Sequence, residues 1–104
     1  MIRVSVFYPH DPSKKFDFDY VLNSHLPMVE RLLGPVGLQS AGMDKGISTA
    51  DPNAPAPFVA VNHLLFNTVE EVHQAFMTHG SEIMSDVKNY TDITPQIQIS
   101  EVVS

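Results

Sequence analysis

The stretch from Phe58 to Phe66 constrains the fold of this 104-residue chain more than any other feature. Almost all of its residues are apolar, and a proline-rich segment over residues 48–57 precedes it. Proline cannot pair inside a sheet, so the proline-rich segment is expected to be a loop. A short apolar run that follows such a loop is typical of a buried strand. Successive side chains of a strand point to opposite faces. A strand that is apolar on both faces therefore predicts a sheet that is covered on both sides.

Three further strands are predicted around this central one. Alternating apolar and polar residues indicate strands over residues 2–8 and 94–102. Another strand is expected over residues 36–47, although its glycines lower the strand propensity.

The first of two predicted helices covers residues 17–33 and ends at Gly34-Pro35. Pro27 lies inside it and removes one backbone hydrogen bond, so we expect the helix to bend there. Helical spacing predicts a buried face made by Phe18, Leu22, His25, Val29 and Leu32.

The second helix is predicted to begin at a capping box formed by Thr68 and Glu71. We expect it to run to about His79, where Gly80 stops it, and a short helical continuation to follow through Val87.

The order strand, helix, strand, strand, helix, strand is that of the ferredoxin-like, or split βαβ, fold of the α+β class. One domain over residues 1–104 accounts for the chain. The helices of this fold cover one face of a four-stranded antiparallel sheet and leave the other face bare. Because a large exposed apolar face is rare in a soluble monomer, we expect a second copy to cover it, giving a barrel-like homodimer.

Composition excludes several classes of partner. Twelve acidic and six basic residues give a net charge of -6, which argues against nucleic acid and against an anionic membrane surface. The absence of cysteine excludes a disulfide framework and a thiolate zinc site. No apolar run is long enough to cross a bilayer, and the N-terminus does not resemble a signal peptide, so a cytoplasmic location is expected.

His25 and Tyr20 are the candidate catalytic residues. His25 lies on the predicted apolar helix face, two residues before Pro27, where an imidazole can act as a general acid or base near neutral pH. Its alternative role is that of a buried histidine bonded to a backbone carbonyl that Pro27 frees. Tyr20 either donates a hydrogen bond to a developing oxyanion or packs as an ordinary aromatic residue. The two are five residues apart, so they reach one pocket only if the helix is distorted.

Candidate substrate-binding residues are His63, Asn89 and Tyr90. His63 and its neighbour Asn62 interrupt the apolar central strand, and each must find a hydrogen-bond partner. Because strand side chains alternate, at most one of them lines a given cavity. Asn89 and Tyr90 precede the last strand, where they form either the rim of a pocket or a turn with a core aromatic residue.

No metal ion and no cofactor are predicted. No histidines stand four residues apart, no His-Glu-x-x-His pattern occurs, and no glycine-rich nucleotide-binding pattern follows a strand. A haem would need an axial ligand such as His25 or His63, and nothing else in the sequence supports one.

Several motifs along the chain point to a known family. They are Tyr8-Pro9, Phe16-Asp17 followed by Tyr20, His25-Leu26-Pro27-Met28-Val29, Phe66, and Asp86-Val87-Lys88-Asn89-Tyr90-Thr91-Asp92. Together they resemble the EthD family, within the dimeric α/β-barrel group of ferredoxin-like proteins. The resemblance implies a homodimer with a pocket between sheet and helices in each subunit.

The wider barrel group includes cofactor-free monooxygenases, muconolactone-type isomerases, polyketide cyclases and haem-handling enzymes. The resemblance does not choose among these chemistries. From His25 and Tyr20 we expect a cofactor-independent enzyme of catabolic or secondary metabolism that moves a proton next to a carbonyl of a small, apolar, oxygenated metabolite, giving isomerisation, cyclisation or oxygenation. The alternatives are a non-catalytic ligand-binding protein of a degradative pathway and an oxidoreductase that uses a borrowed haem or flavin.

Overall fold

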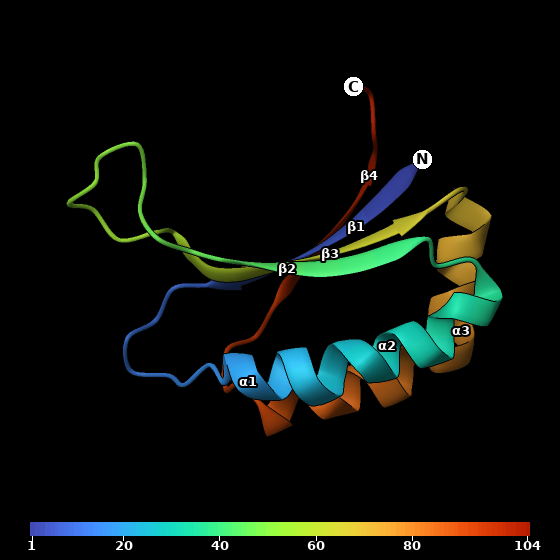
Figure 1. Cartoon of the computed structure of the whole chain (residues 1–104), viewed down its shortest axis with the longest axis horizontal. Helices are drawn as coiled ribbons and strands as arrows, with labels where there is room; N and C mark the ends of the chain where they lie inside the picture. Colours follow the sequence, from blue (N-terminus) through green and yellow to red (C-terminus); the bar gives the residue numbers. More distant parts are fainter.

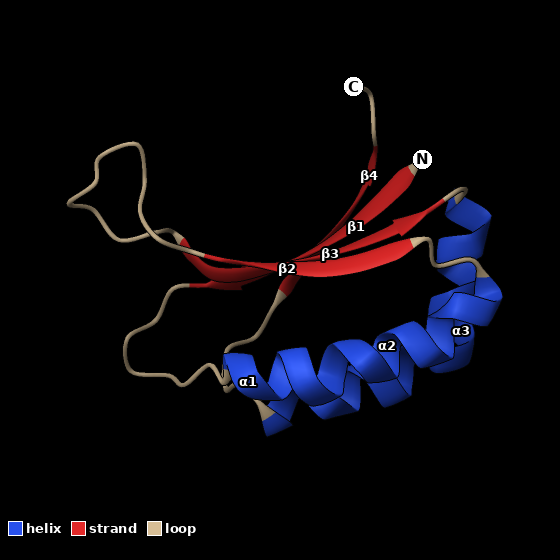
Figure 2. Cartoon of the chain, in the orientation of Figure 1, coloured by secondary structure: helices blue, strands red, loops and turns tan.

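Four strands form an antiparallel sheet in the order β2-β3-β1-β4, and the helices lie against one of its faces (Figure 1). The computed structural model describes residues 1–104. The strands are β1 (Ile2–Pro9), β2 (Ser40–Lys45), β3 (Phe58–Phe66) and β4 (Gln96–Glu101). Figure 2 shows the sheet nearly edge-on, with the helical layer below it.

The predicted ferredoxin-like α+β fold with a four-stranded antiparallel sheet is confirmed. β3 is a central strand, as its apolar composition indicated, and it pairs with β1 on one side and β2 on the other. β2 and β4 are shorter than predicted. The segment between β2 and β3 is the expected loop, and it extends beyond the end of the sheet (Figure 1).

The first helical rod contains a widened turn just before Pro27. It consists of α1 (Phe18–Tyr20), the π-helical turn η1 (Val21–His25) and α2 (Leu26–Leu33). In η1 the Leu26 amide donates to the carbonyl of Val21, five residues back, instead of four. The helix distortion that we expected at Pro27 is therefore a π turn that lies just before it. A short 3-10 turn, η2 (Gly34–Val36), ends the rod.

The π turn corrects the predicted buried face. Leu22 was expected inside, but it is 54% exposed, and Val21 is buried instead. In a regular α-helix the positions one turn before His25 are Leu22 and Val21, whereas in the wider π turn they are Val21 and Tyr20.

The second helix, α3 (Val69–Asp86), corrects another prediction. It begins at the expected capping box of Thr68 and Glu71 but continues through Gly80 without a break. Glycine weakens a helix interior by only about 0.5–1 kcal/mol, and burial of Ile83 on the following turn opposes that loss. A 3-10 turn, η3 (Val87–Asn89), follows. No helix is long and apolar enough to span a membrane.

Two clusters of buried side chains fill the space between the sheet and the helices. The larger one is built from Ile2, Val4, Val29, Leu33, Leu64, Phe66, Val72, Ala75 and Ile83. The second contains Tyr8, Val21, Leu26, Ala60, Val87, Tyr90 and Ile93. The second cluster joins the π turn to the segment after α3, and the candidate site lies where the two clusters meet.

The sheet face turned away from the helices, here called the outer face, mixes apolar and polar residues. On β3 it carries Val61, His63 and Leu65, all partly buried. The neighbouring strands add mostly polar side chains to this face. On β1, for example, Arg3 lies opposite Leu65 and Ser5 lies opposite His63. The outer face is therefore less apolar than the central strand alone predicted.

Candidate active site

His25 is the centre of a hydrogen-bonded chain of side chains inside the protein. It is the last residue of the π turn and only 3% exposed. Its Nδ1 lies 2.9 Å from Oδ2 of Asp86, the last residue of α3. A carboxylate only accepts hydrogen bonds, so this contact places the proton of neutral His25 on Nδ1 and leaves Nε2 as an acceptor.

Asp86 is held by two further donors. The Tyr20 hydroxyl donates to Oδ1 at 2.7 Å, and the Asn89 amide donates to the same atom at 2.9 Å. Burial works to raise the pKa of Asp86, but the hydrogen bonds from Tyr20, Asn89 and His25 together lower it below its ordinary value. Asp86 is thus kept as an anion, and its hydrogen bond raises the pKa of Tyr20.

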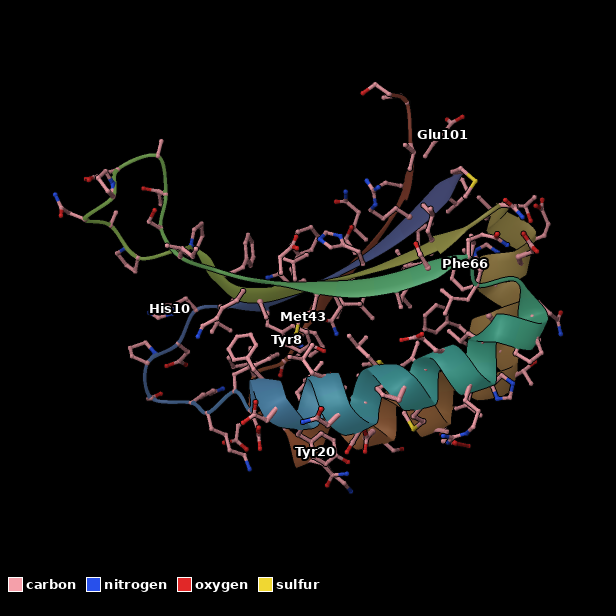
Figure 3. All side chains as sticks on the ribbon, viewed as in Figure 1. Tyr8, His10, Tyr20, Met43, Phe66 and Glu101 are labelled. Atoms are coloured by element: carbon pink, nitrogen blue, oxygen red, sulfur yellow. The ribbon has the colours of Figure 1, made fainter.

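The π turn explains how Tyr20 and His25 reach one carboxylate. Residues five apart lie on different sides of a regular α-helix, whereas the wider π turn of η1, with its hydrogen bond between residues five apart, brings them to nearly the same side. Tyr20 and His25 therefore meet on the Asp86 carboxylate, although only His25 lines the cavity. Figure 3 shows Tyr20 on the side of the helical layer away from the sheet and Tyr8 between the two layers.

Two buried tyrosines continue the chain on the other side of His25. The Tyr90 hydroxyl lies 3.4 Å from His25 Nε2 and 2.5 Å from the Tyr8 hydroxyl. The Tyr90 ring also stands 4.8 Å from the His25 ring, centroid to centroid. Burial raises the pKa of Tyr8 and of Tyr90, so both hydroxyls stay protonated near neutral pH.

A small apolar cavity of about 30 Å³ lies beside His25, between the sheet and the helices. Its polar lining consists of Tyr8, His25 and Asn62. The apolar lining consists of Val6, Leu26, Val29, Leu64, Phe76, Ile83, Met84, Val87 and Ile97. Oδ1 of Asn62 is buried there without a hydrogen-bond partner.

Four of the five predicted site residues lie in one hydrogen-bonded network, and the fifth, His63, lies apart from them. Asp86 brings together His25, Tyr20 and Asn89, and Tyr90 contacts His25 directly. Tyr20, Asn89 and Tyr90 do not line the cavity.

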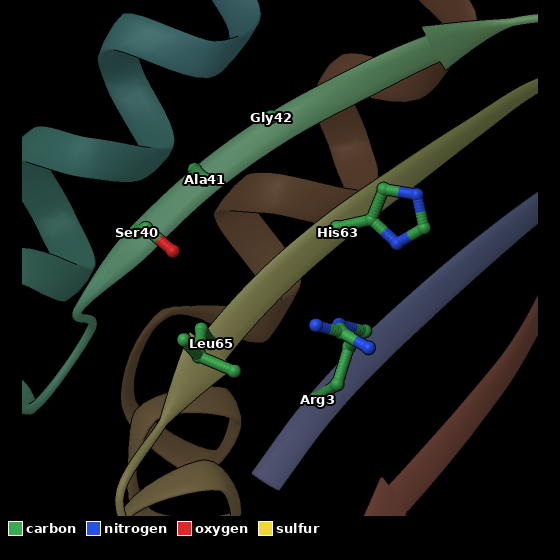
Figure 4. A pocket seen from close by; sticks show the side chains of 6 residues that line it. All are labelled: Arg3, Ser40, Ala41, Gly42, His63 and Leu65. Carbon is green, nitrogen blue, oxygen red and sulfur yellow. The ribbon is translucent and has the colours of Figure 1, made fainter. Parts of the chain in front are cut away.

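His63 lies on the outer face, on the other side of the sheet from His25. There its Nε2 is 2.7 Å from Oδ2 of Asp44. It borders a shallow hollow of about 310 Å³ with Arg3, Ser40, Ala41, Gly42 and Leu65 (Figure 4). As alternation predicted, only one of Asn62 and His63 lines the cavity beside His25, and it is Asn62.

Sequence reasoning did not select Asp86 and Tyr8 as site residues. Both stood in the motifs that carry the family resemblance, and Asp86 precedes Asn89 by one helical turn, which was an available signal. Nothing in the local pattern distinguished Tyr8 from the other inward residues of its strand. Its role depends on Tyr90, which is 82 positions away.

The site has no set of residues for a metal ion, because no three histidine or acidic side chains gather anywhere in the structure. The cavity beside His25, at about 30 Å³, has room for a water molecule or two, so in this structure it fits neither a metabolite nor a haem or flavin.

The fold and the buried His25 site define a ferredoxin-like protein with a candidate small-molecule site between sheet and helices. Within this class the chain belongs to the EthD family, because the EthD domain model matches residues 10–94. No curated protein matches the sequence.

Solved structures agree with this assignment. An EthD-like protein from Ralstonia eutropha is 39% identical, with a TM-score of 0.92 over 99% of this chain and 92% of its own. A dimeric ferredoxin-like protein from an uncultured marine organism is 12% identical, with a TM-score of 0.55 over 100% and 96% of the two chains. SnoaB, a cofactor-independent oxygenase from Streptomyces nogalater, is 10% identical, with a TM-score of 0.58 over 99% and 92%. The last two similarities show the fold alone.

Proposed function

We propose that this EthD protein is a small-molecule enzyme in which His25 removes a proton next to a carbonyl, without a bound cofactor. The single observation that carries the proposal is the position of His25, buried between the Asp86 carboxylate and an apolar cavity. The existence of a cofactor-independent oxygenase with the same fold supports it as a class of chemistry. Isomerisation, cyclisation and oxygenation by dioxygen all begin with such a step.

In the proposed step, His25 Nε2 takes the proton and the electron pair of the broken C–H bond moves onto the substrate carbonyl, forming an enolate. Asp86 accepts the Nδ1 hydrogen bond and stabilises the imidazolium that forms. Tyr8 lines the cavity, and its hydroxyl stays protonated. When substrate is bound, the single proton of the Tyr90 hydroxyl is donated to Tyr8, which leaves His25 Nε2 free to take the substrate proton and the Tyr8 proton free to be donated to the enolate oxygen.

The other residues of the network position these groups. Tyr20 and Asn89 hold the Asp86 carboxylate in place, and Tyr90 bridges His25 and Tyr8. Tyr20, expected from the sequence to contact substrate, is thus a positioning residue in this proposal. His63 takes no part in it, because the sheet separates His63 from the cavity.

The proposal requires the cavity to widen when substrate binds. Its volume of about 30 Å³ is too small for a metabolite. Two of its wall residues are partly exposed, Met84 at 39% and Ile97 at 49%, so this wall is the one that can move into solvent.

Hydrogen–deuterium exchange of a simple ketone tests the proposal. Acetophenone in D2O exchanges its methyl protons through the enolate, and proton NMR follows the loss of the methyl signal. We expect the protein to accelerate this exchange above buffer. We expect His25→Ala to lose about 100-fold or more of the acceleration, because general base catalysis is typically of that size.

His73→Ala is the matched control, since His73 is exposed on α3 and outside the network. Equal acceleration by the wild type and His25→Ala would overturn the proposal. Binding of acetophenone without any acceleration would favour the alternative, a non-catalytic ligand-binding protein.

A homodimer is the second part of the proposal. We infer that a second copy covers the outer face, where Val61 and Leu65 are partly buried and Arg3 and Asp44 provide opposite charges. The similarity in fold to a dimeric ferredoxin-like protein supports this arrangement.

A further inference from the structure

Asn62 is the one polar side chain on the inner face of the central strand. It is buried, and its Oδ1 has no hydrogen-bond partner. The residues paired with it across the sheet are Val6 on β1 and Met43 on β2, and neither side chain offers a donor. A buried acceptor left unpaired destabilises the folded chain, whereas a leucine of similar size at this position would not.

Asn62 lines the cavity between sheet and helices together with His25 and Tyr8, so the unpaired oxygen belongs to the candidate site. The ring nitrogens of His25 already face Asp86 and Tyr90, and the Tyr8 hydroxyl faces Tyr90. Asn62 is therefore the polar group of the cavity whose acceptor the protein does not satisfy. A ligand that brings a donor to it would restore the missing hydrogen bond.

The rest of the lining restricts the chemistry of that ligand. Leu26, Val29, Leu64, Phe76 and Ile83 surround the cavity with apolar surface, and no lysine or arginine lines it. A carboxylate or phosphate would be buried there as an unpaired charge and would offer Asn62 Oδ1 only acceptors. A neutral hydroxyl on an apolar body supplies the donor without the charge.

We propose that the cavity binds a neutral, apolar, hydroxyl-bearing molecule whose hydroxyl donates to Asn62 Oδ1, and that this molecule enters between α3 and β4 past Met84 and Ile97. Those two residues are partly exposed, and the unbranched methionine side chain can rotate aside. The inference rests on the proposed function only in naming this molecule as the substrate of His25. Binding can be measured separately from catalysis.

Phenol and toluene are the probes, because they share a ring and differ in the hydroxyl. Methyl and amide NMR titrations of the wild-type protein give both dissociation constants and the location of binding. We expect phenol to bind at least about 10-fold more tightly than toluene, although toluene leaves water more readily. The Asn62 side-chain amide and the Met84 and Ile97 methyl signals should shift, whereas the Met77 methyl on the exposed side of α3 should not.

Asn62→Leu should reverse the preference, weakening phenol and strengthening toluene, and should raise the melting temperature because the unpaired oxygen is gone. Asn53→Leu, in the exposed loop before β3, is the matched control and should leave both affinities unchanged. If the leucine variant does not fold, Asn62→Val tests the same reversal with a smaller side chain.

Tighter binding of toluene than phenol by the wild-type protein would overturn the inference, as would binding of neither probe or an unchanged preference in the Asn62 variants. The acetophenone exchange distinguishes the two proposals, because exchange that depends on His25 together with no preference for phenol would overturn this inference alone.

Discussion

Asp86 organises the candidate site at the scale of single residues. Its two carboxylate oxygens accept hydrogen bonds from Tyr20, Asn89 and His25, which come from the first helical rod and from the turn after α3. A carboxylate with this many donors stays ionised and fixes the tautomer of the histidine beside it. The tautomer and orientation of His25 in the proposed mechanism therefore depend on a residue that does not touch the cavity.

The three tyrosines give a prediction at the same scale. Burial raises the pKa of Tyr8 and Tyr90, and the hydrogen bond to Asp86 raises that of Tyr20, so all three pKa values lie above the ordinary 10.0. Such groups stabilise the folded state fully below pH 10, and this stabilisation is lost as the pH rises through the folded pKa.

Absorbance at 295 nm, followed as the pH is raised, should show no tyrosine ionising near pH 10. Ionisation should instead appear together with the loss of secondary structure seen by circular dichroism. A tyrosine that ionises near pH 10 in the folded protein would contradict this account.

At the scale of elements, the first helical rod and α3 both depart from regular patterns, for different reasons. η1 widens next to Pro27, which cannot continue the normal hydrogen-bond pattern, and this places Tyr20 and His25 on the same carboxylate. α3 instead tolerates Gly80 in its interior, because residues on both sides of the glycine are buried against the sheet.

A pair of glycine substitutions tests this view of the helices. A Cβ at Gly80 would meet Phe76 at 3.5 Å, an ordinary contact, so Gly80→Ala should stabilise the protein by about 0.5–1 kcal/mol. Gly37 has a φ of 116°, and a Cβ there would meet the Glu71 carboxylate. Gly37→Ala should therefore destabilise it by about 1–2 kcal/mol.

Urea unfolding followed by circular dichroism measures both effects. A loss of stability in Gly80→Ala would mean that Gly80 is required in α3 for close packing.

At the scale of the whole molecule, the two faces of the sheet differ in how they are covered. The helices and the two apolar clusters bury the inner face. On the outer face, Val61 and Leu65 lie beside Arg3 and His63, so any contact made there combines apolar area with charges. A mixed surface of this kind suits a self-complementary interface between two copies.

Light scattering coupled to size exclusion tests the proposed dimer. We expect the wild-type protein to be dimeric at micromolar concentration. Val61→Asp should weaken the dimer by at least about 10-fold in dissociation constant, or about 1.4 kcal/mol, because it would bury a carboxylate without a partner.

Met77→Asp, a change at an 83% exposed position on α3, is the control and should remain dimeric. Thermal melts confirm that both variants are folded. A wild-type protein that runs as a monomer would remove the dimer from the proposal and leave the His25 site unaffected.

The sequence by itself determined the order of strands and helices, the central place of β3 and the capping box at the start of α3. These features follow from periodicities and capping patterns within a few residues, so a linear pattern contains them. It also singled out His25, because a histidine on an apolar face before a proline is conspicuous without any partner.

Only the tertiary structure decided what surrounds His25. Asp86 lies 61 positions away along the chain, and Tyr90 lies 65 positions away. Their contacts form because the fold brings the end of α3 against the π turn, and no local sequence pattern encodes a contact between residues so far apart in the chain. The same holds for the unpaired oxygen of Asn62, which is unusual only because its neighbours across the sheet are apolar.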